Sequence, residues 1–217
     1  MEYGFVRWLG HASFLIRTGD LNVFIDPFKL PDVVEKADMI FITHPHFDHM
    51  HEESIAKIET PKTHFVMPHE AATKLRRKNV TVVSPGDSGE VLGIKFEAVP
   101  AYNNKPEKMR FHQKTNGWVG YIITANGKRI YHPGDTDLID EMGDIDVDLA
   151  LLPCGGTYVM DIDDAIRATK VIRAEHFAMM HYKTVLGKEK SEEAEKKFKE
   201  NVKNAVWFED ENPIYSF

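Results

Sequence analysis

The chain has 217 residues, of which 42% are hydrophobic and 28% are charged, and its formal net charge is -7. This length and apolar fraction are sufficient for a substantial core, so we expect a single domain over residues 1–217. The acidic total argues against a nucleic-acid binder, because such domains normally carry a basic surplus, and no run approaches the ~18 apolar residues of a membrane span.

The cysteine content and the N-terminus predict the compartment. Cys154 is the one cysteine, so it has no intrachain disulfide partner, which is typical of a reducing environment. Residues 1–20 lack a basic segment followed by an apolar stretch. We therefore expect a cytoplasmic protein with no membrane partner, and the sequence leaves the oligomeric state open, a homo-oligomer included.

The first third of the chain alternates short apolar runs with turn residues. Strands are predicted at 3–9, 13–18 and 21–26, with Thr18-Gly19-Asp20 as a hairpin turn. A short helix is expected over 31–37, followed by a strand over 39–43. Helices at 51–58 and 69–78 then flank a strand at 64–67.

The remaining two thirds read as strands first and strand–helix alternation later. Residues 80–86, 89–102, 117–127 and 128–134 are strand-like, and Asn126-Gly127 is a strong hairpin signal. An apolar strand at 146–153 precedes a helix at 161–174, a strand at 176–182 and a polar helix at 191–204 capped by Ser191. This order favours an α/β fold of the α+β type, with mixed sheets covered by helices.

Imidazoles and carboxylates gather where three of these strands end. The strand at 39–43 runs into His44, His46, Asp48 and His49, and the later strands run into Asp135 and His181. Imidazole and carboxylate suit divalent zinc, manganese, iron or nickel. His44 and His46 can face one ion, and Asp48 and His49 a second, with Asp135 as a bridge and His181 completing the second site. A solvated turn gains nothing from packing three imidazoles together, so the pattern indicates metal binding.

These motifs resemble the metallo-β-lactamase superfamily. Residues 44–49 (HPHFDH), with Gly134-Asp135-Thr136 and His181, carry the resemblance. Residues 10–18, 25–27, 117–123, 131–137, 151–161 and 180–182 are similar to the ascorbate-6-phosphate-lactonase-like branch of small hydrolases. The resemblance implies a four-layer αββα sandwich of two mixed sheets flanked by helices, and a dinuclear site at one edge.

The sequence departs from the family at one metal ligand. Members usually supply the third histidine of the first metal in a Pro-Ala-x-His pattern, and here Asn103 stands in that position. His112 follows nine residues later in the same loop and is the favoured replacement, because a neutral amide oxygen binds these metals poorly. Asn103 remains the alternative ligand, and a site completed by neither would be weaker.

Several further residues are candidates for contacts near the metals, each with a structural alternative. His11 matches the branch's Gly-His motif and is expected at the cleft, against substrate or a carboxylate, or else in the core. Asp26 suits a partner for the far nitrogen of a ligating imidazole. Tyr158 is expected to approach the substrate, with a tight turn as its alternative, and Lys183 to steer an anionic group, with a solvated lysine as the default. Cys154 reads as a buried strand-end cysteine rather than a ligand.

The expected chemistry is metal-assisted hydrolysis of a small molecule. Two divalent ions, zinc first, would supply hydroxide at neutral pH, with Asp48 orienting it and accepting its proton. Length and resemblance favour a small ester or lactone, phosphorylated or not, as the substrate; this is an analogy at the level of the fold. A phosphodiesterase or nuclease with the same site, and a non-catalytic metal-binding scaffold, are the alternatives.

Overall fold

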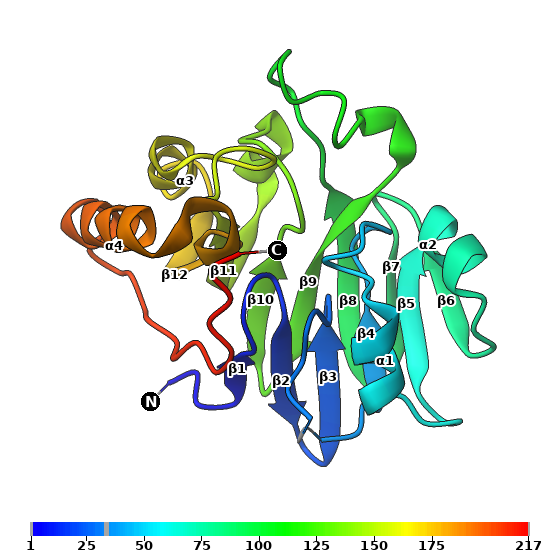
Figure 1. Cartoon of the computed structure of the whole chain (residues 1–217). Coiled ribbons are helices and arrows are strands. Elements are labelled where there is room, and N and C mark those ends of the chain that lie inside the picture. Colours follow the sequence, from blue (N-terminus) through cyan, green and yellow to red (C-terminus); the bar gives the residue numbers. More distant parts are fainter. Residues whose placement is uncertain (1, 33–34, 217) are drawn as a thin grey trace.

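Two six-stranded mixed sheets face each other and carry helices on their outer faces (Figure 1). A computed structural model describes residues 2–32 and 35–216. The first sheet has the order β1 (Val6–Trp8), β2 (Phe14–Thr18), β3 (Leu21–Ile25), β4 (Met39–Phe41), β5 (His64–Pro68), β6 (Val80–Val83). The second has the order β12 (Arg173–Met180), β11 (Asp146–Pro153), β10 (Lys128–His132), β9 (Val119–Ala125), β8 (Ile94–Pro100), β7 (Ser88–Val91).

The helices form the two outer layers. Helices α1 (Glu52–Ile58) and α2 (His69–Leu75) lie beside the first sheet, and α3 (Ile162–Ala168) and α4 (Lys183–Asn201) cover the second (Figure 1). Two short 3-10 turns, η1 (Lys114–Asn116) and η2 (Asp140–Asp144), complete the described elements. This arrangement confirms the predicted αββα sandwich. No helix in the described ranges combines the length and hydropathy that crossing a bilayer requires.

The period-2 alternation of the strands separates two cores. In β4, Met39 and Phe41 join the core between the sheets, whereas Ile40 points to the opposite face. There Ile40 packs with Ile55 of α1 and Leu75 of α2. All three β4 residues are buried, as expected for a strand covered on both faces. The continuous apolar run before His44 therefore marks a strand in the middle of the sandwich.

Parallel pairing brings several strand ends to one edge of the sandwich. Strands β3 to β6 pair in parallel in the first sheet, and β10 to β12 do so in the second. Carboxyl ends of parallel strands open toward a common edge, where α/β proteins place functional side chains. Asp26, His44, Asp135 and His181 all follow such ends. The topology thus predicts a shared site.

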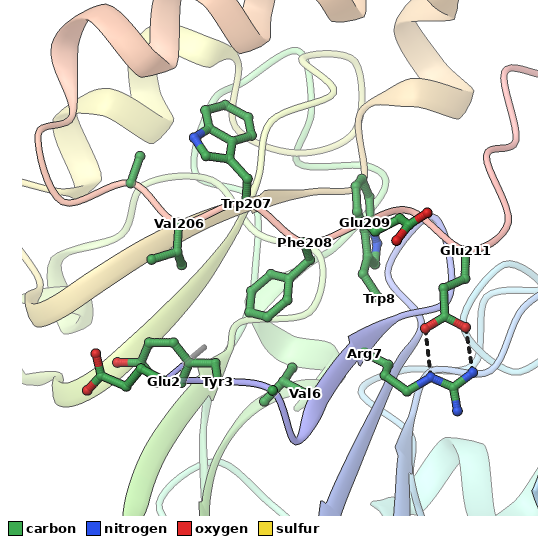
Figure 2. Close-up of a pocket in the computed structure, with 12 residues that line it drawn as sticks. Glu2, Tyr3, Val6, Arg7, Trp8, Val206, Trp207, Phe208, Glu209 and Glu211 are labelled. Carbon is green, nitrogen blue, oxygen red and sulfur yellow. Dashed lines mark hydrogen bonds and ion pairs between the residues drawn. The ribbon is translucent and has the colours of Figure 1, made fainter.

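The C-terminal segment 204–211 joins the outer edges of the two sheets. The amide of Val206 donates to Phe177 on β12, and that of Glu211 donates to Trp8 on β1. Figure 2 shows this segment opposite the N-terminal residues, with Arg7 hydrogen-bonded to Glu211. A pocket of about 500 Å³ lies between the two segments. No histidine is among the described residues that line it, so it is separate from the predicted metal site.

Four predicted helices differ from the structure. The helix predicted over 69–78 ends at Leu75, because Arg76 adopts a left-handed backbone conformation. The helix predicted over 31–37 is absent in the described residues, and residues 33–34 lie outside the described part. The Ala37 amide donates to the Ile58 carbonyl, and the Lys36 carbonyl accepts from the Asn22 side chain. These bonds to other segments hold the chain extended. The helix predicted to reach 174 ends at Ala168, since β12 begins at Arg173. Ser191 is not a cap: α4 starts at Lys183, and the Ser191 hydroxyl donates to Gly187 at a kink.

Candidate metal centre

Asp26 organises the turn that follows β4. Its two carboxylate oxygens accept from the Thr43 amide (2.8 Å) and the Thr43 hydroxyl (2.6 Å). The hydroxyl in turn accepts from Nδ1 of His44 at 2.9 Å, and Asp26 Oδ2 accepts directly from Nδ1 of His49 at 2.7 Å. With its Nδ1 proton engaged, the neutral ring of His44 keeps the lone pair on Nε2. Asp26 was predicted to accept from the far nitrogen of a ligating imidazole, and here it accepts from Nδ1 of His49.

A first group of three imidazoles forms around this turn. His44 Nε2 lies 3.0 Å from His46 Nδ1, and His112 brings a nitrogen within 4.8 Å of both. His112 comes from the loop between β8 and β9, at the top of Figure 1. Trp118 at the end of this loop packs against all three rings, with centroids 4.8–5.6 Å away. The loop therefore delivers the third nitrogen of the group.

Asn103 holds His112 rather than taking its place. Its Oδ1 accepts from Nδ1 of His112 at 2.8 Å, and its Nδ2 donates to the Tyr158 carbonyl at 2.9 Å. The backbone amide of Asn103 also donates to the backbone carbonyl of His112. Nε2 of His112 is thereby turned inward, 3.3 Å from Oδ2 of Asp135. Of the two residues considered for the third position, His112 presents a nitrogen to the cluster and Asn103 orients it.

A second group lies on the other side of Asp135. His49 Nε2 and His181 Nε2 are 3.7 and 3.6 Å from Asp48 Oδ2, and each is 3.2 Å from Asp135 Oδ1. Because Asp135 Oδ2 faces His112, one carboxylate presents one oxygen to each group. The bridging role expected of Asp135 stays a prediction that this arrangement permits.

His11 belongs to the second group. Its Nε2 lies 3.0 Å from Asp48 Oδ2, and its Nδ1 lies 3.1 Å from the Thr184 hydroxyl. The ring centroid is 3.9 Å from that of His181. His11, Asp26 and His181 all adopt positive φ, a costly conformation that clusters at functional sites. The backbone here is held in place by the fold, since the His181 amide donates to the His11 carbonyl.

The donor set fits divalent metals on two counts. First, several buried polar atoms that converge here have no hydrogen-bond partner among the described residues: His49 Nε2, His112 Nε2, His181 Nε2 and Asp135 Oδ1. Buried polar groups are normally paired, so such orphans call for an ion or water. Second, ligands about 2.1 Å from one ion lie about 3.0–3.4 Å apart, and the contacts of Asp135 with His49, His181 and His112 are 3.2–3.3 Å.

Burial and charge set the protonation of the cluster. Burial, reinforced by neighbouring imidazoles, lowers the pKa of His46 to about 4 and that of His11 to about 3. Burial also lowers the pKa of His44, so these rings are neutral, which is the form that binds metals. Burial acts in the same direction on His181, but Asp135 outweighs it and raises that pKa to about 9. A cation in the second group is therefore electrostatically favoured.

A pocket of about 390 Å³ opens beside the cluster and is where a substrate can reach it. Tyr158 lines it together with Asp48 and His112, and its approach to a substrate stays a prediction. Lys183 does not line it: its ammonium lies 3.2 Å from Asp210 and over the ring of Trp8. Phe47 and Phe111 also line the pocket, and neither was among the site residues predicted from the sequence.

Two supporting residues had weak signals in the sequence. Thr43 links Asp26 to His44, and its position directly before the histidine turn is the one hint of this role. Trp118 precedes β9 within a segment that carried the family resemblance, yet nothing in its type indicates contact with imidazoles.

Comparisons with known proteins identify the family. A family profile described as the beta-lactamase superfamily domain matches residues 5–181. A UPF0173 metal-dependent hydrolase of Thermoplasma volcanium is 34% identical over 191 residues, 82% of this chain and 83% of that protein. One from Alkaliphilus metalliredigens is 31% identical over 227 residues, 98% and 99% of the two chains.

Solved structures share the fold over nearly the whole chain. A crystal structure from Parabacteroides distasonis has a TM-score of 0.84 and 29% identity, covering 94% of this chain and 92% of that one. Igni18, a metallo hydrolase from Ignicoccus hospitalis, has a TM-score of 0.75 and 26% identity, covering 96% and 94%. The chain belongs to the beta-lactamase superfamily and, within it, to the family of UPF0173 metal-dependent hydrolases.

Proposed function

We propose that the protein hydrolyses a small ester or lactone at a dinuclear metal centre. The carrying observation is the convergence of orphaned nitrogen and oxygen atoms on both sides of Asp135. His44, His46 and His112 would hold one ion, and Asp48, His49 and His181 the other, with Asp135 shared. Zinc suits this donor set, and manganese, iron or nickel are alternatives for the experiment to distinguish.

The proposed substrate class also rests on the similarity of several segments to the ascorbate-6-phosphate-lactonase-like branch. Divalent ions in such a centre supply Lewis acidity, which activates water at neutral pH and polarises a carbonyl. Asp48 would orient the attacking water and take up its proton. Burial alone would raise the pKa of Asp48, but His49, His11 and His181 outweigh burial and hold it below its usual range. The carboxylate is therefore ionised, which is the form that binds a metal ion.

Two residues would assist Asp48 in this reaction. His11 contacts Asp48 Oδ2 at 3.0 Å and would fix the direction of the carboxylate. Tyr158 lines the pocket, and its hydroxyl would donate to the oxygen of the carbonyl as charge develops there. In the proposed reaction, Asp48 is the base, His11 is the positioning residue and Tyr158 is the hydrogen-bond donor.

Metal content tests this proposal directly. The purified protein, reconstituted with zinc, manganese, iron or nickel, is compared with His44→Ala and His112→Ala by elemental analysis. About two ions per wild-type chain are expected, falling to about one or fewer in both variants. His69→Ala is the matched control, because His69 is exposed on α2 and outside the cluster.

Activity is measured on the same samples with a panel of lactones and carboxylic esters. Turnover that appears with metal and disappears after chelation supports the proposal. A wild-type protein that takes up no ion under any of the four conditions refutes it. Metal retained by His112→Ala at the wild-type level would refute the assignment of His112.

A further inference from the structure

The pocket beside the metal ligands is lined by residues of two chemical kinds, here called the donor wall and the aromatic wall. One wall consists of donor residues of the metal centre: His46, Asp48, His112 and Asp135. The other is aromatic and consists of Phe47, Phe111 and Tyr158. A substrate whose bond is cleaved beside the donor residues shares the pocket with the aromatic residues.

The aromatic wall is fixed close to the donor wall. Phe47 stands between His46 and Asp48 in the sequence, so its position relative to both is set by the turn. Its side chain is 60% exposed although it contacts Phe28 edge-on at 5.8 Å. Phe111 precedes His112 and packs edge-on against Tyr158, with ring centroids 4.9 Å apart. These rings offer apolar surface within one residue of three candidate ligands.

Four lysines around the site are paired with carboxylates, and two other basic groups lie over aromatic rings. Lys105 and Lys108 bond Asp164 and Asp137, and Lys114 bonds Glu141. Lys183 lies beside Asp210. Arg110 and Lys29 lie over the rings of Phe111 and Phe28. Among the residues that the structure describes, no lysine or arginine lines the pocket, so an anionic substituent would meet aromatic rings and the carboxylates of Asp48 and Asp135.

We propose that the substrate carries an uncharged apolar group, aromatic or alkyl, next to the scissile carbonyl, and that Phe47 and Phe111 bind this group. Phosphorylated and carboxylated analogues are then poor ligands. The inference rests on the proposed function, because it takes the metal centre as the place of bond cleavage. It narrows the substrate class to hydrophobic esters or lactones.

Hydroxamate binding tests the inference without requiring turnover. The metal-loaded protein is titrated calorimetrically with acetohydroxamate, phenylacetohydroxamate and the carboxylate-bearing malonic monohydroxamate, which share one metal-binding group. The phenyl probe is expected to bind about 10- to 100-fold tighter than the methyl probe, the size of discrimination that apolar pockets achieve. The carboxylate probe is expected to bind no tighter than the methyl probe.

Variants assign the effect to the aromatic wall. Phe47→Ala and Phe111→Ala should each lose most of the phenyl advantage while retaining wild-type metal content and acetohydroxamate affinity. Leu92→Ala is the matched control, since Leu92 is an exposed apolar residue on the turn between β7 and β8. Arg110→Ala should also leave the preference unchanged.

The possible failures are distinguishable. Tighter binding of the carboxylate probe than of the phenyl probe, or a phenyl advantage that survives both phenylalanine substitutions, overturns the inference while leaving a hydrolase of other esters intact. Metal-dependent binding with the expected preference, but no turnover of any ester or lactone, upholds the aromatic subsite and refutes the proposed reaction.

Discussion

Replacing Asn103 by alanine should release His112 from its fixed orientation and weaken the metal centre. The Asn103 side chain is 2% exposed and uses both ends, accepting from His112 Nδ1 and donating to the Tyr158 carbonyl. Each buried group left unpaired costs about 1–3 kcal/mol. We expect Asn103→Ala to lower the free energy of unfolding by about 2–3 kcal/mol, because water that enters the vacated space offsets part of that cost.

Asn103→Ala should weaken metal binding by more than an equally destabilising substitution away from the metal centre would. Removing the hydrogen-bond partner of a ligating imidazole typically costs 10- to 100-fold in affinity, which corresponds to about 1.4–2.7 kcal/mol. Asn103→Asp separates orientation from stability. Its carboxylate still accepts from His112 but sets an oxygen against the Tyr158 carbonyl. It should therefore bind metal better than Asn103→Ala while remaining less stable than the wild type.

Chelator competition and urea unfolding measure the two quantities on the same samples. The control is Asn104→Ala, because Asn104 is an exposed amide whose Nδ2 bonds the Leu138 carbonyl without touching the cluster. The reasoning is refuted if folded Asn103→Ala binds metal as tightly as the wild type and Asn104→Ala. In that case the contact with His112 does not orient its ring.

Three further outcomes follow from local geometry. Burial raises the pKa of the Cys154 thiol, so a thiol reagent should leave it unmodified in the native protein and label it in urea. Gly134 has φ +64°, and an added Cβ would lie 2.9 Å from Thr43 Cβ, so Gly134→Ala should lower both the melting temperature and the metal content. Gly127→Ala is the control: Gly127 has φ +74° but open space around it, so this variant should lower the melting temperature only. Asp137 accepts from two backbone amides of the loop that carries the third histidine, so Asp137→Ala should cost about 3 kcal/mol in urea unfolding and reduce metal occupancy.

The sequence predicts those structural features that depend on interactions among a few neighbouring residues. The run before His44 had to be a buried strand, and the spacing of the next imidazoles limits where they can point. The ends of helices and strands that are set by tertiary contacts could not be predicted as well from the sequence. Residues 169–174 suit a helix by composition, yet Arg173 starts β12 because its amide donates to Ile145 at the entry of β11. Propensity gives way where a sheet offers backbone partners.

The same distinction applies to the candidate site. That Asn103 and His112 form a pair could not be read from a separation of nine residues, because the loop between them is shaped by remote contacts such as that of Lys108 with Val159. Lys183 appeared suited to the cleft by its place after His181, but α4 begins there and turns the ammonium toward Asp210. Side-chain direction at a helix start depends on partners that the local sequence does not contain.

The segment 204–211 has a consequence for how the chain is made. A ribosome releases this segment after the strands of both sheets have emerged and can pair. Until Val206 and Glu211 reach β12 and β1, both edge strands present unpaired amide and carbonyl groups, which are templates for association with other chains. Chains stopped before residue 204 should therefore accumulate in aggregates, whereas chains that contain residues 204–211 protect both edges once these residues have left the exit tunnel.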